Sequence, residues 1–169
     1  MIDADYVRLM ARYNAWQNAQ LTKMLEGMSA KDLTADRGAF FGSIFATLNH
    51  ILWGDTLWMS RFTNDVQKPS VGAEGHKTFT PTFAVWSAER FRLDGRIKTW
   101  ASRLNTIDLT GALSWYSGMT QRDLSKPMAT CVVHFFNHQT HHRGQVHAMM
   151  TAAGMTAPTT DIVFMPEDA

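Results

Sequence analysis

The sequence predicts an all-α fold, a four-helix bundle with one short hairpin before the last helix. Apolar residues recur at roughly 3.6-residue spacing over four long stretches, and only one short segment has the alternation typical of strands. Residues that favour helix starts or stops stand at the borders of these stretches. The 169 residues suit one domain, 1–169, which is large enough to bury a core.

The first two helices have clear borders. Asp3 suits the N-terminal dipole of the first helix, and Gly27 suits its end. A loop is expected through Gly42. Ser43 then fits the N-cap of a second helix that ends near Asn64. Apolar residues lie nearly all round this second helix, so it should be deeply buried.

The third helix is expected to follow a loop over residues 65–79, which contain proline and glycine. Thr80 fits an N-cap, and Pro81 fits the first helical position. The helix should continue to about Leu104. This helix is about as long as the other predicted helices. Helices of similar length can pack side by side, so we expect a bundle.

The last third of the chain holds the hairpin and the fourth helix. Residues 106–126 could form the hairpin, with Ser117-Gly118 as its turn. Pro127 opens the fourth helix, and Gly154 is its natural stop. The tail that follows should be irregular.

Composition and charge exclude several classes of function. Apolar residues make up 45% and charged residues 18%, with a net charge of +1, so neither nucleic acid nor a membrane surface is an expected partner. The single cysteine, Cys131, cannot form an internal disulfide, which favours a cytoplasmic location. Asp3 and Arg8 stand where a signal peptide needs an apolar core. The uncharged stretch 38–54 is too short and polar to span a bilayer.

One face of the fourth helix is unusually rich in metal-binding side chains. Two histidines at positions i and i+4 stand one turn apart, so both imidazoles can reach one ion. Spacing alone allows two such pairs, His134 with His138 and His138 with His142. Cys131 could be a soft ligand, but we expect it to be a small buried thiol. The face comprises Cys131, His134, His138, His141, His142, Gln145 and Met149.

A third ligand must come from another helix. His50 is the only histidine outside the fourth helix that lies in a predicted buried helix, whereas His76 lies in a glycine-containing loop. The chain contains no H-E-x-x-H, C-x-x-C or Glu-x-x-His motif, which excludes the common zinc and di-iron layouts. The expected cofactor is therefore one divalent transition ion, Zn, Ni, Fe or Mn, at an open three-histidine site.

Three segments resemble the DinB-like family of damage-inducible, YfiT-like metalloenzymes. Residues 133–145 (VHFFNHQTHHRGQ) match its signature, residues 48–55 (LNHILWGD) its second motif, and residues 13–18 (YNAWQN) its typical opening. The order of elements fits nearly the whole chain. The resemblance implies a four-helix bundle of the up-up-down-down type and a homodimer. It also implies a metal on His50, His138 and His142, with His134 and His141 as neighbours.

The resemblance also suggests a reaction. Characterised relatives include thiol S-transferases and a mycothiol-dependent maleylpyruvate isomerase. We therefore expect metal-dependent transfer of a low-molecular-weight thiol to an electrophilic small-molecule substrate. The alternatives are a metal-dependent hydrolase and a non-catalytic bundle that binds a metal or a small ligand.

Further expectations concern the fourth helix. Gly144 should allow close approach of another backbone, because glycine inside a helix is otherwise unfavourable. Gln145 could orient a ligand or be a core residue, and Arg143 should have a structural role. A second surface should be buried in the homodimer, around Val132, Val133, Phe135 and Phe136.

Overall fold

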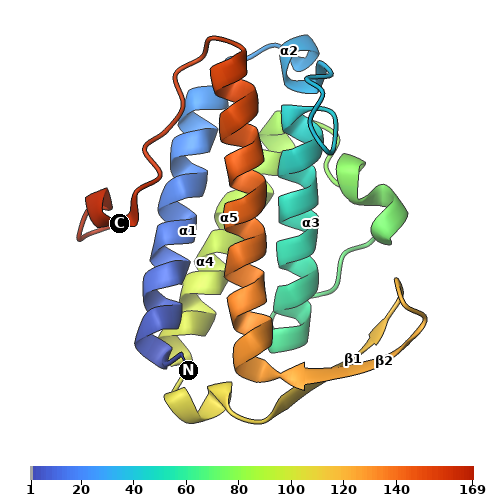
Figure 1. The fold of residues 1–169 in the computed structure, drawn as a ribbon, viewed down its shortest axis with the longest axis vertical. Helices are drawn as coiled ribbons and strands as arrows, with labels where there is room; N and C mark the ends of the chain where they lie inside the picture. The colour runs from blue at the N-terminus through green and yellow to red at the C-terminus, as the bar shows by residue number, and fades with distance from the viewer. Residues whose placement is uncertain (1) are drawn as a thin grey trace.

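Four long helices pack side by side in the computed structural model, which describes residues 2–169 (Figure 1). These helices are α1 (Ala4–Leu25), α3 (Ile44–Phe62), α4 (Phe83–Arg103) and α5 (Met128–Ala152). None of the helices described in residues 2–169 is long and apolar enough to cross a membrane. The predicted, mostly helical fold is confirmed, and it includes a small two-stranded sheet. The shorter elements are α2 (Ala30–Thr34), η1 (Ala73–Thr78), η2 (Thr106–Leu109), β1 (Ala112–Ser117), β2 (Arg122–Pro127) and η3 (Ile162–Phe164).

Side-chain caps explain where the first two long helices begin. The Asp3 side chain accepts a hydrogen bond from the Tyr6 amide, and the Ser43 hydroxyl accepts one from the Ala46 amide. Each bond satisfies one amide that has no partner within the helix. At the end of the last helix, Gly154 follows α5 with φ +74°, the left-handed conformation that glycine adopts without strain.

The start of α4 differs from the prediction. Thr82, not Thr80, is the N-cap, and its hydroxyl accepts from the Val85 amide at 3.3 Å. Thr80 is buried, and both its amide and its hydroxyl donate to Oδ1 of Asn49, at 2.9 and 2.7 Å. The Thr80 side chain therefore ties the incoming chain to α3, and the helix begins two residues later.

Two segments predicted as loops contain short helices. The region before Gly42 includes α2, which is capped by Ser29 and buries Leu33. The region 65–79 includes η1, a 3-10 helix without buried residues. Elements of five and six residues are too short to show a helical apolar period, so the sequence pattern could not reveal them.

The helix directions also differ from the prediction. The start of α4 lies beside the start of α3, where Trp86 Nε1 donates to the Leu48 carbonyl at 3.0 Å. Their ends meet through Arg103 and Asp65, so α3 and α4 run in the same direction. The order is up-down-down-up instead of up-up-down-down (Figure 1). The single long crossover, residues 63–82, carries the chain back along the bundle.

The predicted hairpin is confirmed. Strands β1 and β2 pair antiparallel, with Trp115 opposite Leu124, and the turn follows Ser117. The Trp115 ring packs edge-on against Trp58 of α3, with ring centroids 5.4 Å apart. This contact fixes the hairpin beside α3 and close to the start of α5.

The surface predicted for the homodimer lies inside the bundle. Val132, Phe135 and Phe136 are fully buried within one chain. Phe135 packs edge-on against Phe62, and Phe136 packs edge-on against Tyr6. Neighbouring helices cover these three side chains, and the fourth, Val133, is half-buried. Together they cannot form a second surface, and a dimer would need a different one.

A network of buried charges crosses the bundle behind α5. Arg90 lies 2.6 Å from Asp55 and 2.7 Å from Asp94, and all three side chains are buried. Asn14 donates to Asp94 and accepts from Arg143. Buried charges are tolerated when they are paired in this way. The network joins all four long helices and so fixes the position of α5 along α3. Arg143 is part of this network, so it has the structural role that we expected.

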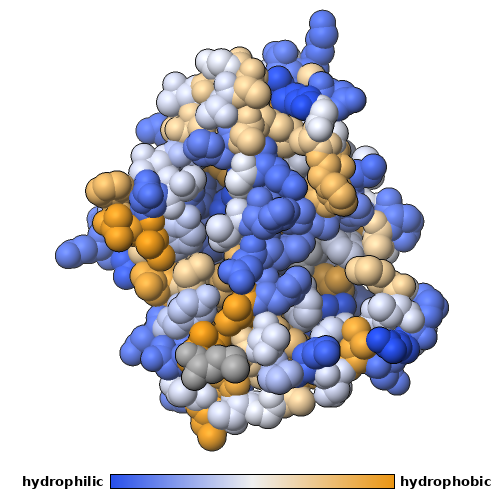
Figure 2. Space-filling view, viewed as in Figure 1, coloured by the Kyte–Doolittle hydropathy of each residue, from blue (hydrophilic) through white to orange (hydrophobic). Residues whose placement is uncertain are grey.

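The C-terminal tail lies along α1. Tyr13 donates to the Thr160 carbonyl at 2.7 Å, and Gln17 donates to the Thr159 carbonyl at 2.9 Å. Hydrophilic residues cover much of the face in Figure 2, and an apolar patch at its left edge coincides with η3. Val163 and Phe164 of η3 are exposed.

Candidate metal centre

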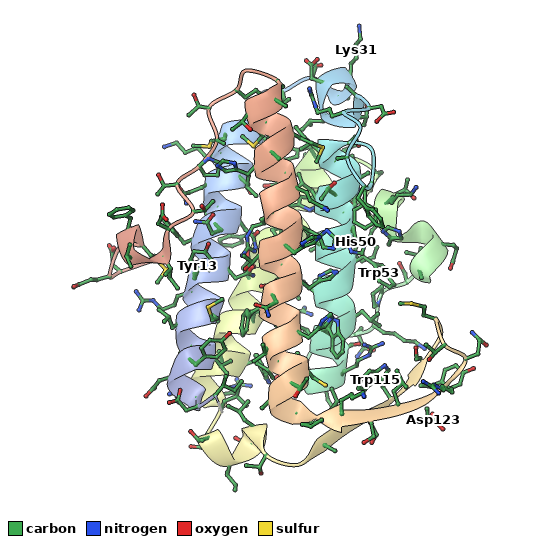
Figure 3. The ribbon with its side chains drawn as sticks, viewed as in Figure 1. Tyr13, Lys31, His50, Trp53, Trp115 and Asp123 are labelled. Atoms are coloured by element: carbon green, nitrogen blue, oxygen red, sulfur yellow. The ribbon has the colours of Figure 1, made fainter. Side chains whose placement is uncertain are left out.

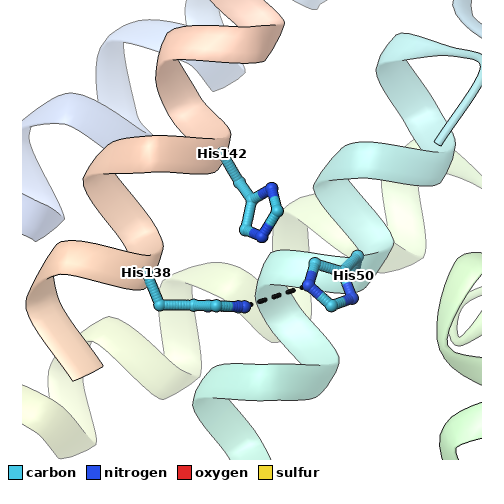
Figure 4. Close-up of side chains that lie close together, drawn as sticks. All are labelled: His50, His138 and His142. Carbon is cyan, nitrogen blue, oxygen red and sulfur yellow. Dashed lines mark hydrogen bonds between the residues drawn. The ribbon is translucent and has the colours of Figure 1, made fainter. Parts of the chain in front are cut away.

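Two facing helices bring three histidines together in the middle of the bundle (Figures 3 and 4). His50 comes from α3, and His138 and His142 come from consecutive turns of α5. One nitrogen from each ring lies within 4.8 Å of the other two, so the three could hold one metal ion. The Nε2 atoms of His50 and His138 are 3.0 Å apart. The structure thus brings together the three residues that the sequence pointed to.

The structure also distinguishes the two histidine pairs that spacing left open. His134 is exposed, and its ring packs 5.0 Å from Trp58, one turn of α5 away from His138. His141 is also exposed and lies beside His142. Cys131 is a buried free thiol outside the cluster. The neighbours therefore flank the three-histidine cluster without joining it.

Two further side chains hold the cluster from outside. The Nδ1 atom of His142 lies 2.8 Å from Oε1 of Gln145, an oxygen that can only accept. His142 therefore carries its proton on Nδ1 and keeps a lone pair on Nε2. The Nδ1 atoms of His50 and His76 are 2.9 Å apart, so one ring donates to the other. Such contacts orient metal-binding imidazoles in proteins.

Comparison with known proteins agrees with this architecture. The family model described as the DinB family matches residues 1–169. The chain belongs to the DinB family. It is 24% identical over 162 residues to Protein DinB of Bacillus subtilis (strain 168), covering 94% of this chain and 92% of that protein. A crystal structure of a DinB-like protein from Bacillus cereus ATCC 10987 superposes with a TM-score of 0.60 at 20% identity, over 87% of this chain and 90% of that one.

His76 is the residue of this DinB-family site that sequence reasoning missed. It lies on η1, within the long crossover between α3 and α4, and its only sequence context is a glycine-containing loop. Its position beside His50 depends on the path of the crossover across α3. No spacing rule connects residues 50 and 76, so the sequence carried no signal for this contact.

Aromatic rings form one wall of the site. The Phe41 ring lies 4.2 Å from the His50 ring and 5.2 Å from the rings of His76 and His142. Trp53 stacks beside His50 at 6.4 Å, and its Nε1 donates to the Val71 carbonyl at 2.9 Å. These rings shield that side of the histidines from water.

Burial keeps the imidazoles neutral. Burial, followed by the neighbouring His138 and His142, lowers the pKa of His50 to about 3. Burial and then His142 lower the pKa of His138 to about 3 as well. The pKa of His142 is also lowered by burial, against the opposing effect of its bond to Gln145. Neutral imidazole is the form that binds metals, so these three residues fit a divalent transition ion.

Glycine is needed at one position of α3. A Cβ atom on Gly54 would lie 3.0 Å from Cε1 of His138, tighter than most contacts in proteins. Gly144, which was expected to allow close packing, is exposed and has no atom within 4 Å of its Cβ position. That expectation was wrong, because Gly144 points away from the neighbouring helices. Gly54, and not Gly144, is the helical glycine that lets a neighbouring helix pack closely.

Proposed function

We propose that this DinB-family chain is a metal-dependent enzyme that transfers a low-molecular-weight thiol to an electrophilic small molecule. The observation that supports this most is the convergence of His50, His138 and His142. Three neutral nitrogens are enough to hold an ion, and they leave coordination positions for substrate, as catalytic sites do. A structural site would instead be closed by a fourth protein ligand.

A bound Zn, Ni, Fe or Mn ion would supply Lewis acidity, which lowers the pKa of a thiol or water at the site. The remaining chemistry falls to the chain's own residues. Gln145 fixes the proton of His142 on Nδ1, so that Nε2 stays available. Phe41 and Trp53 keep water from one side of the site, which strengthens electrostatic effects there.

The proposed reaction forms one sulfur–carbon bond. The thiol loses its S–H proton to a base in solution, and a sulfur lone pair attacks the electrophilic carbon. In a substitution, the leaving group departs with its bonding electron pair. In an addition to an activated double bond, the electron pair of the double bond moves to the neighbouring carbon, which then takes a proton from solvent. The thiol and the electrophile are the only reactants, so no oxidant or reductant is required.

The test measures consumption of 2-mercaptoethanol with 1-chloro-2,4-dinitrobenzene as the electrophile. We expect activity in the wild type, loss on chelation, and recovery when Zn²⁺, Ni²⁺, Fe²⁺ or Mn²⁺ is added. His142→Ala should be inactive. His147→Ala should be active, because His147 is not one of the three clustered histidines. Equal rates in the wild type, the chelated protein and His142→Ala would overturn the proposal.

A further inference from the structure

A half-buried arginine of α3 packs against two tryptophans. The Arg61 guanidinium is 4.5 Å from the ring centre of Trp58 and 5.1 Å from that of Trp115. The two ring centres are themselves 5.4 Å apart, so the guanidinium lies against both rings. Trp58 belongs to α3 and Trp115 to β1, so a helix and the hairpin both contact the cation. Stacking of this kind fixes the plane of a guanidinium while its N–H groups stay free at the edge.

Within residues 2–169, no carboxylate forms an ion pair with Arg61, and no side-chain or backbone oxygen accepts a hydrogen bond from it. Burial lowers the pKa of Arg61, and the neighbouring Cys131 thiol acts in the opposite direction. Lys126 also acts on Cys131, and His134 lies close to Arg61, so the surroundings are basic. A partly desolvated cation without a counter-ion is unfavourable unless an anion binds to it.

The Arg61 position is connected to the histidine cluster by a short series of rings. Trp58 lies 5.0 Å from His134, and His134 lies 5.8 Å from His138. On α3, Arg61 follows His50 by eleven residues, which places both on nearly the same helix face, about 16 Å apart along the axis. Figure 3 shows Trp53 and Trp115 along the same side of α3.

We propose that Arg61 binds the carboxylate of the thiol substrate, at the far end of a binding surface that begins at His50, His138 and His142. This inference rests on the proposed thiol transfer. The guanidinium would donate two parallel hydrogen bonds to the carboxylate, a geometry that lysine cannot reproduce. Arg61 would thus select among thiols without touching the reacting atoms.

The spacing also selects the size of the thiol. With about 16 Å between His50 and Arg61 along the helix axis, a two-carbon acid is too short to reach both positions. In an extended thiol of tripeptide size the sulfur and the far carboxylate are roughly 10 Å apart, and the contacts made at the two ends cover the rest. Mercaptoacetate carries both groups but is too short to reach. The expected substrate class is therefore an acidic thiol of about tripeptide size.

The test compares binding of glutathione, glutathione diethyl ester and mercaptoacetate to the Zn²⁺-loaded protein, by equilibrium dialysis without oxygen. The wild type should bind glutathione about tenfold more tightly than the ester, the effect expected of a charge-assisted pair. Arg61→Met, which keeps an apolar stem against the tryptophans, should lose this preference without changing mercaptoacetate binding. Arg61→Lys should keep only part of it. Arg103→Met, which removes an exposed arginine, should behave as the wild type.

The inference is overturned if the wild type binds acid and ester equally or binds neither, or if Arg61→Met keeps the preference. If Arg61→Met fails to fold, the acid–ester comparison in the wild type and in Arg61→Lys still decides. Failure of thiol transfer itself is seen separately with 2-mercaptoethanol, which has no carboxylate and does not depend on Arg61. A preference for glutathione in a protein that does not consume 2-mercaptoethanol would leave the anion site standing and remove the proposed function.

Discussion

The Nδ1 atoms of His50 and His76 lie 2.9 Å apart, and this contact joins the crossover between α3 and α4 to the histidine cluster. If Nε2 of His50 held a metal, its Nδ1 would carry the proton and would donate a hydrogen bond to Nδ1 of His76. The crossover then fixes the orientation of a metal-binding ring. His76→Ala should weaken metal binding roughly 10–100-fold while the fold is kept. Competition with a chromogenic chelator measures the affinity. His147→Ala is the control, and unchanged affinity in His76→Ala would remove His76 from the site.

Gly54 and Gly144, which both lie inside long helices, should respond in opposite ways to alanine. Gly54→Ala places a methyl group 3.0 Å from His138, so it should displace the ring and lower metal affinity about tenfold. Gly144→Ala meets open space and should raise the free energy of unfolding by about 0.5–1 kcal/mol. Metal competition and urea unfolding give both values. Full metal affinity in Gly54→Ala would show that the helix can adjust.

The stability of the metal-free protein should depend on pH through His50 and His138. The pKa of each is 6.5 in the unfolded chain and about 3 in the folded protein. Between these values, the two histidines take up protons only when the chain is unfolded. The free energy of unfolding should therefore fall as the pH drops from about 6.5 towards 3. Urea midpoints at several pH values measure this. A variant with glutamine at both positions should have a flatter profile, whereas His147→Gln should not. Identical slopes in all three proteins would contradict the assignment.

The homodimer stays a prediction. A groove of about 920 Å³ lies between α1 and α4, away from the histidines, and its lining includes Ala19, Ala88 and Phe91. The Phe91 side chain is 82% exposed, and a second copy could cover it. Light scattering should give twice the 19.1 kDa chain mass, and Phe91→Glu should give the monomer. A monomeric wild type at micromolar concentration would rule the dimer out.

The sequence predicted what depends on local chemistry. Ser43 and Gly154 border their helices because capping and left-handed glycine act within a few residues. Helical spacing indicated the histidine-rich face of α5, and the family resemblance selected His138 and His142 from it. His50 could be added because it was the only histidine outside the fourth helix in a predicted buried helix.

The remaining features depend on contacts between distant segments. Thr80 is not a cap because Asn49, 31 residues away, uses its hydroxyl. The role of His76 depends on where the crossover lies, and the need for glycine at position 54 depends on a ring from α5. The helix directions depend on the same crossover. None of these relations leaves a pattern in a single sequence.

The central claim is that three histidines hold one metal ion, and the most direct measurement is metal content per chain. Wild type, His50→Ala, His138→Ala, His142→Ala and His147→Ala would be loaded with Zn²⁺, dialysed and analysed by mass spectrometry for the element. We predict one ion per chain in the wild type and in His147→Ala, and almost none in the other three, because two imidazoles make a weak site. Full occupancy in any one of those three variants would contradict the claim.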